Sequence, residues 1–215
     1  PTIKWDMRLQ GNGINVAKLG SLPQSALAFD LKTRGTQPLG KAAWVLHAEI
    51  PALTGTFNAL PVQARAGVTL NGDTIRIDDL RATLGANQVT ADGTWGPNND
   101  LVWHVNAREL QQLDSRFQGA VRADGTLRGA SNALQAIIDL DAQKLRFGTF
   151  EVATVKVNAD VYLNPKQVTT SHVEAQLQHV SAGAERYNHI TLRATGTAQA
   201  HEATLTAGGT TRRGS

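Results

Sequence analysis

Six histidines are the residues of this chain whose type most readily suggests metal binding or proton transfer. They are His47, His104, His172, His179, His189 and His201. Most of them fall at polar positions of alternating segments, and none belongs to a His-Glu-x-x-His sequence or a comparable zinc pattern. We therefore interpret them as solvent-facing side chains, and the sequence predicts no metal site.

Acidic pairs and glycine motifs are the other candidates for chemistry. Asp78-Asp79 and the pair Asp139/Asp141 could carry carboxylate chemistry or bind calcium, but Asp139 and Asp141 share the polar side of one alternating segment, where water separates them. Gly11-Asn12-Gly13 lacks the third glycine and the following helix of a dinucleotide-binding fingerprint. The chain has no G-x-S-x-G motif and no cysteine. The sequence therefore predicts no catalytic residue, no cofactor and no enzymatic activity.

Composition excludes further classes of protein. The chain has 215 residues, of which 41% are hydrophobic, 18% charged and 5% aromatic, which is a balance typical of a folded chain. The net charge of +3 comes from 21 Lys and Arg against 18 Asp and Glu, and the only adjacent basic pair is Arg212-Arg213. Proteins that bind nucleic acid usually concentrate basic residues in a patch. We therefore predict no nucleic-acid partner.

The ends of the chain and its hydropathy bear on its place in the cell. No stretch of the sequence is long and apolar enough for a membrane-spanning helix. The chain begins at Pro1 without a signal-peptide pattern, and we interpret it as a piece of a longer protein. Residues 210–215 are expected to be a flexible tail whose last residues are a cloning remnant.

A period of two residues dominates the chain. Residues 155–163 alternate strictly between apolar and polar side chains, which helical spacing cannot produce. Similar alternation covers residues 44–50, 101–108, 121–128, 138–143, 173–178 and 190–195. Turn residues separate these segments, and Asn71-Gly72-Asp73 is typical of a tight hairpin. The sequence predicts about ten to twelve strands, with Glu109–Asp114 and Ala130–Ala136 as the candidate helices.

An antiparallel sheet with one apolar face must cover that face, and this chain offers almost no helix to do so. Closure into a barrel, folding into a sandwich and curling into a trough are the remaining arrangements. The apolar positions are mostly Ala, Val, Leu and Ile, and the small ones, such as Ala107, Ala123, Ala159 and Ala175, fill the roughly 10 Å between two packed sheets poorly. These small side chains would suit a trough with space for an acyl chain, although the pattern alone leaves the sandwich open.

The apolar positions of the alternating segments are the predicted lining of such a groove, for lipid or for a polypeptide client. They are Trp44, Leu46, Leu101, Trp103, Val105, Val121, Leu127, Ile138, Leu140, Val155, Val157, Val161, Leu163, Val173, Leu177, Ile190 and Leu192.

Several pieces of the chain, in a fixed order, carry a resemblance to a known family. They are Leu80–Gly96 (LRATLGANQVTADGTWG), Asp100–Leu113 (DLVWHVNARELQQL), Phe117–Gly129 (FQGAVRADGTLRG) and, after further alternating segments, Gly196–Ala203 (GTAQAHEA). Together they resemble an internal segment of the TamB family of translocation and assembly module proteins, within the AsmA-like superfamily and its DUF490-type region. The match is weaker before Ala64.

The resemblance implies an all-β fold. The expected architecture is an elongated, curved, mainly antiparallel sheet, a trough or half-tube of the β-taco type, with an apolar concave face and few or no helices. Residues 1–63 would form a less regular N-terminal part of this sheet. Residues 64–209 would form the repetitive β-meander that makes the hydrophobic groove.

The resemblance also implies a non-enzymatic periplasmic segment of a protein anchored in the inner membrane of the Gram-negative cell envelope. Its groove would carry phospholipid, or would chaperone outer-membrane proteins and autotransporters for assembly with an Omp85-type barrel, TamA. A self-contained β-sandwich or β-solenoid binding or adhesion domain is the alternative. The exposed edges and apolar face of such a fragment further suggest a homodimer.

Overall fold

The chain divides into two compact units, residues 1–103 and 104–215. The computed structural model describes residues 2–20, 22–38, 40, 44–163, 169–197 and 199–209. The predicted tail, residues 210–215, lies outside the described residues. The predicted division between residues 63 and 64 falls inside strand β4 (Leu60–Asn71).

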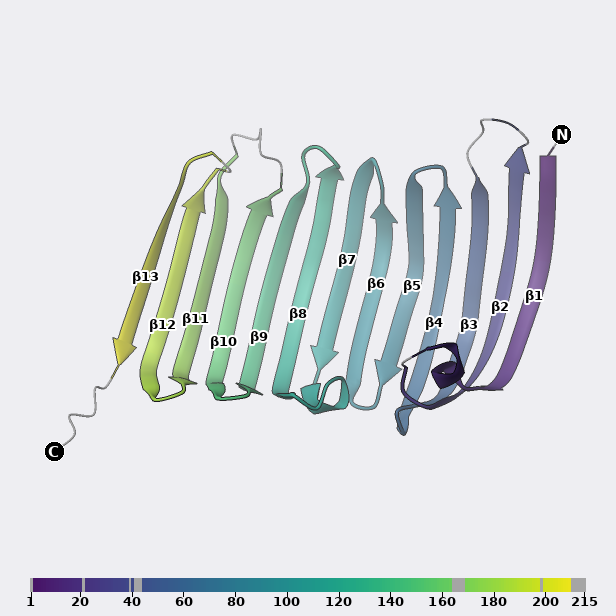
Figure 1. The fold of residues 1–215 in the computed structure, drawn as a ribbon. Coiled ribbons are helices and arrows are strands. Elements are labelled where there is room, and N and C mark those ends of the chain that lie inside the picture. The colour runs from purple at the N-terminus through teal and green to yellow at the C-terminus, as the bar shows by residue number, and fades with distance from the viewer. Residues whose placement is uncertain are drawn as a thin grey trace. The chain divides into compact units, whose positions relative to one another are not determined.

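Unit 1 is built from long antiparallel strands, each beside its neighbour in the chain (Figure 1). It contains β1 (Thr2–Ile14), the 3₁₀ helix η1 (Val16–Leu19), β2 (Ser25–Pro38), β3 (Val45–Phe57), β4, β5 (Thr74–Leu84), β6 (Asn87–Trp95) and the first part of β7 (Asn98–Ala107). The predicted hairpin at Asn71-Gly72-Asp73 joins β4 to β5, and Gly72 has the positive φ, 57°, that this turn requires.

Unit 2 repeats the same arrangement. It contains the end of β7, the 3₁₀ helix η2 (Leu110–Gln112), β8 (Phe117–Ala130), β9 (Gln135–Phe147), β10 (Phe150–Tyr162), β11 (Ser171–Ala182), β12 (Glu185–Gly196) and β13 (His201–Gly209). Each strand from β8 to β13 pairs antiparallel with the next.

The prediction of an all-β, antiparallel chain is confirmed, with thirteen strands in the described residues. There are more strands than predicted because β1 and β2 occupy a region whose alternation is weak in the sequence. The helix predicted at Ala130–Ala136 is wrong, since β8 continues to Ala130 and β9 begins at Gln135. In place of the other predicted helix, Glu109–Asp114, the structure has the shorter 3₁₀ helix η2.

Bulges explain why the alternation of unit 1 is hard to follow. Ile77 and Leu80 of β5 point to the same face because the register shifts between them. The extra residue, Asp79, has a left-handed φ of 48°, and it returns the following apolar residues to the apolar face. A second shift lies in β3 between Ile50 and Leu53.

Unit 2 contains a row at which the alternation changes phase in several neighbouring strands at once. Lys144 in β9 and His179 in β11 both have a φ of 52° at this row. On its two sides lie the paired rows Leu145–Val152–Val180–Tyr187 and Ala142–Val155–Leu177–Ile190. On each strand, the residue in one of these rows is three positions from the residue in the other row. Because strict alternation repeats every two residues, the apolar pattern of one row does not continue into the other.

Few side chains are buried in the described parts of either unit. The buried apolar residues are Ala107, Ala123, Leu134, Ala136, Ala142, Val152 and Val180. Most are small side chains shielded by larger neighbours in the sheet, as Ala142 is by Val121 and Val155. Within each described unit we therefore find one layer of strands, without the filled core that the sandwich alternative requires.

Candidate functional site

Unit 2 presents three consecutive rows of apolar side chains on one face of its sheet, from β8 to β13. The rows are Val121–Ala142–Val155–Leu177–Ile190–Ala207, Ala123–Leu140–Val157–Ala175–Leu192–Leu205 and Gly125–Ile138–Ala159–Val173–Ala194–Ala203. Residues directly opposite one another in an antiparallel pair point to the same face. The rows therefore form a continuous surface without a hydrogen-bonding side chain, which we call the apolar surface. No second layer of strands in the described part of unit 2 covers it.

Most of the predicted lining residues of unit 2 belong to the apolar surface. Val121, Ile138, Leu140, Val155, Val157, Val173, Leu177, Ile190 and Leu192 are members of its rows, and Leu127 and Val161 lie opposite Ala136 in the next row. Val105 alternates with His104, whose ring bonds to Asp124 on the polar face. Leu163 lies after the end of β10 and is 56% exposed.

Unit 1 has a corresponding apolar face that contains more glycine and aromatic residues. Two of its rows are Trp5–Gly35–Leu46–Leu70–Ile75–Trp95 and Met7–Thr33–Ala48–Val68–Ile77–Gly93. The rings of Trp5 and Trp44 meet edge to face, with centroids 6.2 Å apart. Of the predicted lining, Leu46 lies in the first row, and Trp44 precedes it at the same parity. Leu101 lies beside Gly93, and Trp103, two residues further along β7, points to the same face as Leu101.

Two parts of these faces are not predicted by the alternation in the sequence. Ile75, Ile77 and Leu80 are missing from the predicted lining because the bulge at Asp79 breaks their alternation. β13, where Leu205 is 68% exposed, is also missing from it. The alternation of Ala and Leu with Thr over residues 203–207 was a usable signal, but its small side chains made it weak.

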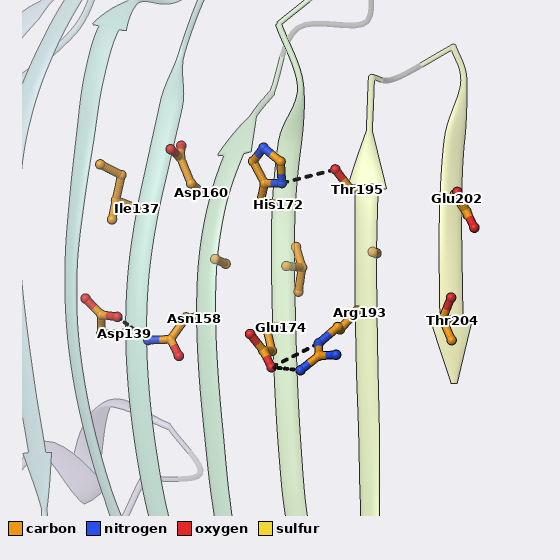
Figure 2. Close-up of a pocket in the computed structure, with 13 residues that line it drawn as sticks. Ile137, Asp139, Asn158, Asp160, His172, Glu174, Arg193, Thr195, Glu202 and Thr204 are labelled. Carbon is orange, nitrogen blue, oxygen red and sulfur yellow. Dashed lines mark hydrogen bonds and ion pairs between the residues drawn. The ribbon is translucent and has the colours of Figure 1, made fainter. Parts of the chain in front are cut away.

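The opposite, polar face of unit 2 carries a hollow of about 710 Å³. Figure 2 shows the polar side chains that line it, which come from β9 to β13: Asp139, Asn158, Asp160, His172, Glu174, Arg193, Thr195, Glu202 and Thr204. Asn158 donates a hydrogen bond of 2.5 Å to Asp139, and Arg193 donates bonds of 3.1 and 3.2 Å to Glu174. The Nδ1 atom of His172 lies 3.0 Å from the Thr195 hydroxyl.

Neighbouring side chains already bond to Asp139, Asp160 and Glu174 of this hollow. Hydrogen bonds from Gln176 and Arg193 lower the pKa of Glu174, and Asp160 accepts a hydrogen bond of 2.7 Å from Gln135. Within the part of the chain that the structure describes, no group of three His, Asp or Glu side chains is arranged to hold a metal ion. The hollow is therefore best interpreted as a solvated polar face held together by cross-strand pairs.

Other polar side chains, including two of the histidines in the sequence, pair in the same way. His47 lies 2.9 Å from the Thr69 hydroxyl, and the ring nitrogen of His104 lies 2.5 Å from Asp124. Hydrogen bonding from His104, with the charge of Arg122 nearby, lowers the pKa of Asp124. The strand geometry thus gives these histidines hydrogen-bonding partners on neighbouring strands.

Comparison with known proteins identifies the family. The profile of a family described as "TamB, N-terminal domain" matches residues 1–215. The chain belongs to the TamB family. It is 22% identical over 187 residues to the translocation and assembly module subunit TamB of Haemophilus influenzae. That match covers 86% of this chain and 14% of the relative, so the chain spans a small part of the relative's length.

The family predicted from the sequence is thus confirmed. No solved structure matches the chain. In the residues that the structure describes, no helix is long and apolar enough to span a membrane.

Proposed function

We propose that this chain is a non-enzymatic, periplasmic segment of a TamB-like protein and that its apolar surface holds the acyl chains of phospholipids. The observation that carries the proposal is the set of three uncovered apolar rows across β8 to β13. Each CH₂ group that leaves water contributes about 0.8 kcal/mol without any directional contact. An acyl chain therefore gains from any position along the rows.

The chemistry of the rows also suits movement of a lipid. Their side chains are Ala, Val, Leu, Ile and one Gly, so no hydrogen bond or ion pair holds a head group at one place. Six strands spaced by about 4.8 Å extend the surface for roughly 24 Å across the sheet. Over that distance a bound chain meets the same environment at each step, and the barriers between positions are low.

An unfolded outer-membrane polypeptide is the second candidate occupant. A strand of such a protein carries apolar side chains at alternate positions, which would lie against the same rows. In either case we propose that the segment acts as part of the full-length protein, together with an Omp85-type outer-membrane barrel such as TamA.

Photocrosslinking in the full-length protein tests the proposal. A photoreactive residue replaces Val157 or Leu192 on the apolar surface, and Lys156, which points to the other face, is the matched control. Crosslinking takes place in the intact periplasm, and mass spectrometry of the purified protein then identifies the adducts. We expect lipid adducts at positions 157 and 192 and none at position 156. Polypeptide adducts at the same positions would favour the second occupant, and equal capture at Lys156 would refute both.

A further inference from the structure

Basic side chains gather around a second hollow of unit 2, near the ends of the strands where β9 turns into β10 and β11 turns into β12 (Figure 1). This hollow has a volume of about 440 Å³. Lys144, Arg146, His179 and Arg186 line it, together with a single carboxylate, that of Glu151. We call it the basic hollow.

The charge of the basic hollow is opposite to that of the hollow in Figure 2. Two guanidinium groups, one ammonium group and one carboxylate line the basic hollow, whereas four carboxylates and one guanidinium line the other, and each also contains one histidine. Strands β9 to β12 contribute to both hollows. Charge is therefore segregated along the strands of unit 2, and an anion is attracted to the basic hollow rather than to the acidic one.

The cations of the basic hollow are only partly engaged within the protein. Arg146 forms an ion pair of 2.7 Å with Glu151, but both side chains are half-exposed, and such pairs contribute little. Arg186 donates a hydrogen bond of 2.9 Å to the Ser181 hydroxyl, which uses one of its five N–H groups. The Lys144 ammonium and the His179 ring have no ion pair or hydrogen bond with any residue that the structure describes.

The backbone at Lys144 and His179 gives a second, independent observation. The pairing of β10 with its two neighbours places Ala153 between these residues. Both have a φ of 52°, a left-handed conformation that is strained for a long side chain and that occurs preferentially at ligand sites. Glycine would adopt it without strain. A lysine and a histidine at these two positions therefore indicate a use for their side chains.

We propose that the basic hollow binds the phosphate group of a phospholipid. Guanidinium and ammonium groups donate charge-assisted hydrogen bonds to phosphate oxygens. Lys144 and His179 each lie two residues along their strands from a member of the first apolar row, Ala142 and Leu177. Two residues of a strand span about 7 Å, so the basic hollow adjoins the end of the apolar surface. The inference rests on the proposed function for the source of the phosphate group.

Acetylation of lysines in the purified full-length protein tests this assignment, because a bound phosphate shields the Lys144 amine. Mass spectrometry measures the acetylation rates of Lys144 and of Lys156, a lysine of β10 outside the hollow that serves as the matched control. The protein is mixed with short-chain phosphatidylglycerol, with inorganic phosphate, or with sodium chloride at the same ionic strength. We expect the lipid to slow acetylation of Lys144 and to leave Lys156 unchanged.

Two arginine variants of β12 extend the test. The lipid concentration that halves the rate at Lys144 should rise about tenfold in Arg186→Gln, since one charged hydrogen-bond donor is lost. Arg193→Gln, which changes the acidic hollow instead, should leave that concentration unchanged. Equal slowing at Lys144 and Lys156 would overturn the inference, as would protection by inorganic phosphate without protection by the lipid. An unchanged lipid concentration in Arg186→Gln would overturn it too.

Photocrosslinking at Val157 is a separate readout of the proposed function. Lipid adducts at position 157 without protection of Lys144 would leave the proposed function standing and overturn this inference. Protection of Lys144 without adducts at position 157 would support the phosphate site and contradict the proposed role of the apolar surface.

Discussion

At the scale of single residues, the exposed ion pair between Asp114 and Arg116 is the clearest electrostatic feature. The Arg116 guanidinium donates to both carboxylate oxygens of Asp114, at 2.5 to 3.0 Å. Together with a hydrogen bond of 2.9 Å from the Arg116 backbone N–H, it lowers the pKa of Asp114 to about 2. Because the folded pKa lies below its ordinary value of 3.8, any stability from this pair is present above that value and is lost as pH falls toward 2.

We predict that Arg116→Gln moves the pKa of Asp114 up toward 3.8. A pH titration of the carboxyl ¹³C shift of Asp114 measures this. Arg122→Gln is the matched control, since Arg122 neighbours Asp124 instead. A midpoint that stays at about 2 in Arg116→Gln would show that the Arg116 side chain is not the main cause.

The turn between β3 and β4 contains a correctable strain. Asn58 and Ala59 have φ values of 51° and 62°, and two positive φ angles in succession suit Asn-Gly. Ala59→Gly should therefore raise the free energy of unfolding by about 1 kcal/mol, as measured by urea denaturation. Gly183→Ala should lower it by a similar amount, because Gly183 has a φ of 61° with open space around it. Destabilisation by Ala59→Gly would contradict this account.

At the scale of strands, an aromatic ring stabilises a glycine in the neighbouring strand. Trp5 of β1 is the register partner of Gly35 of β2, and a Cβ atom built on Gly35 would lie 2.1 Å from the Trp5 ring. A glycine weakens a strand, and a cross-strand aromatic side chain that covers it compensates. The ring thus occupies the space that any larger residue at Gly35 would need.

We predict that Gly35→Ala displaces the Trp5 ring and costs about 1 kcal/mol of unfolding free energy. In a Trp5→Ala background the same substitution should be neutral or stabilising, because the clash is gone. Urea denaturation of the two single variants and the double variant measures the coupling. Additive effects would rule out the Trp5 contact as the cause. Gly67→Ala, whose Cβ would lie 3.3 Å from Asp78, is the control with a smaller expected effect.

At the scale of the whole molecule, each unit keeps its apolar side chains in a single layer. A charge on an apolar row should therefore cost little compared with a charge in a filled core, where the loss is several kcal/mol. We predict that Val157→Asp lowers the free energy of unfolding by about 1 kcal/mol and abolishes lipid capture. Thr154→Asp, on the polar face of β10, should change neither quantity. A loss of several kcal/mol at Val157 would indicate a packed core.

Much of this architecture was accessible from the sequence. Val155, Val157 and Val161 were assigned to one face because successive side chains of a strand point to opposite faces, and the register confirms that assignment. The family followed from ordered pieces of sequence such as Leu80–Gly96. Ile75 and Ile77 were missed because the bulge at Asp79 makes a change of phase look like the end of a strand.

The direction of each side chain is a local property of an extended backbone, so the amino-acid pattern was enough to predict two faces of opposite character. The alignment of those faces across strands depends on how residues of different strands pair, such as Val121 with Ala142 and Leu192 with Leu205. Only the register therefore showed that the apolar rows are continuous from β8 to β13. It also showed that the alternation of β9 at Lys144 and that of β11 at His179 change phase in the same row, because only the pairing between strands aligns these two positions.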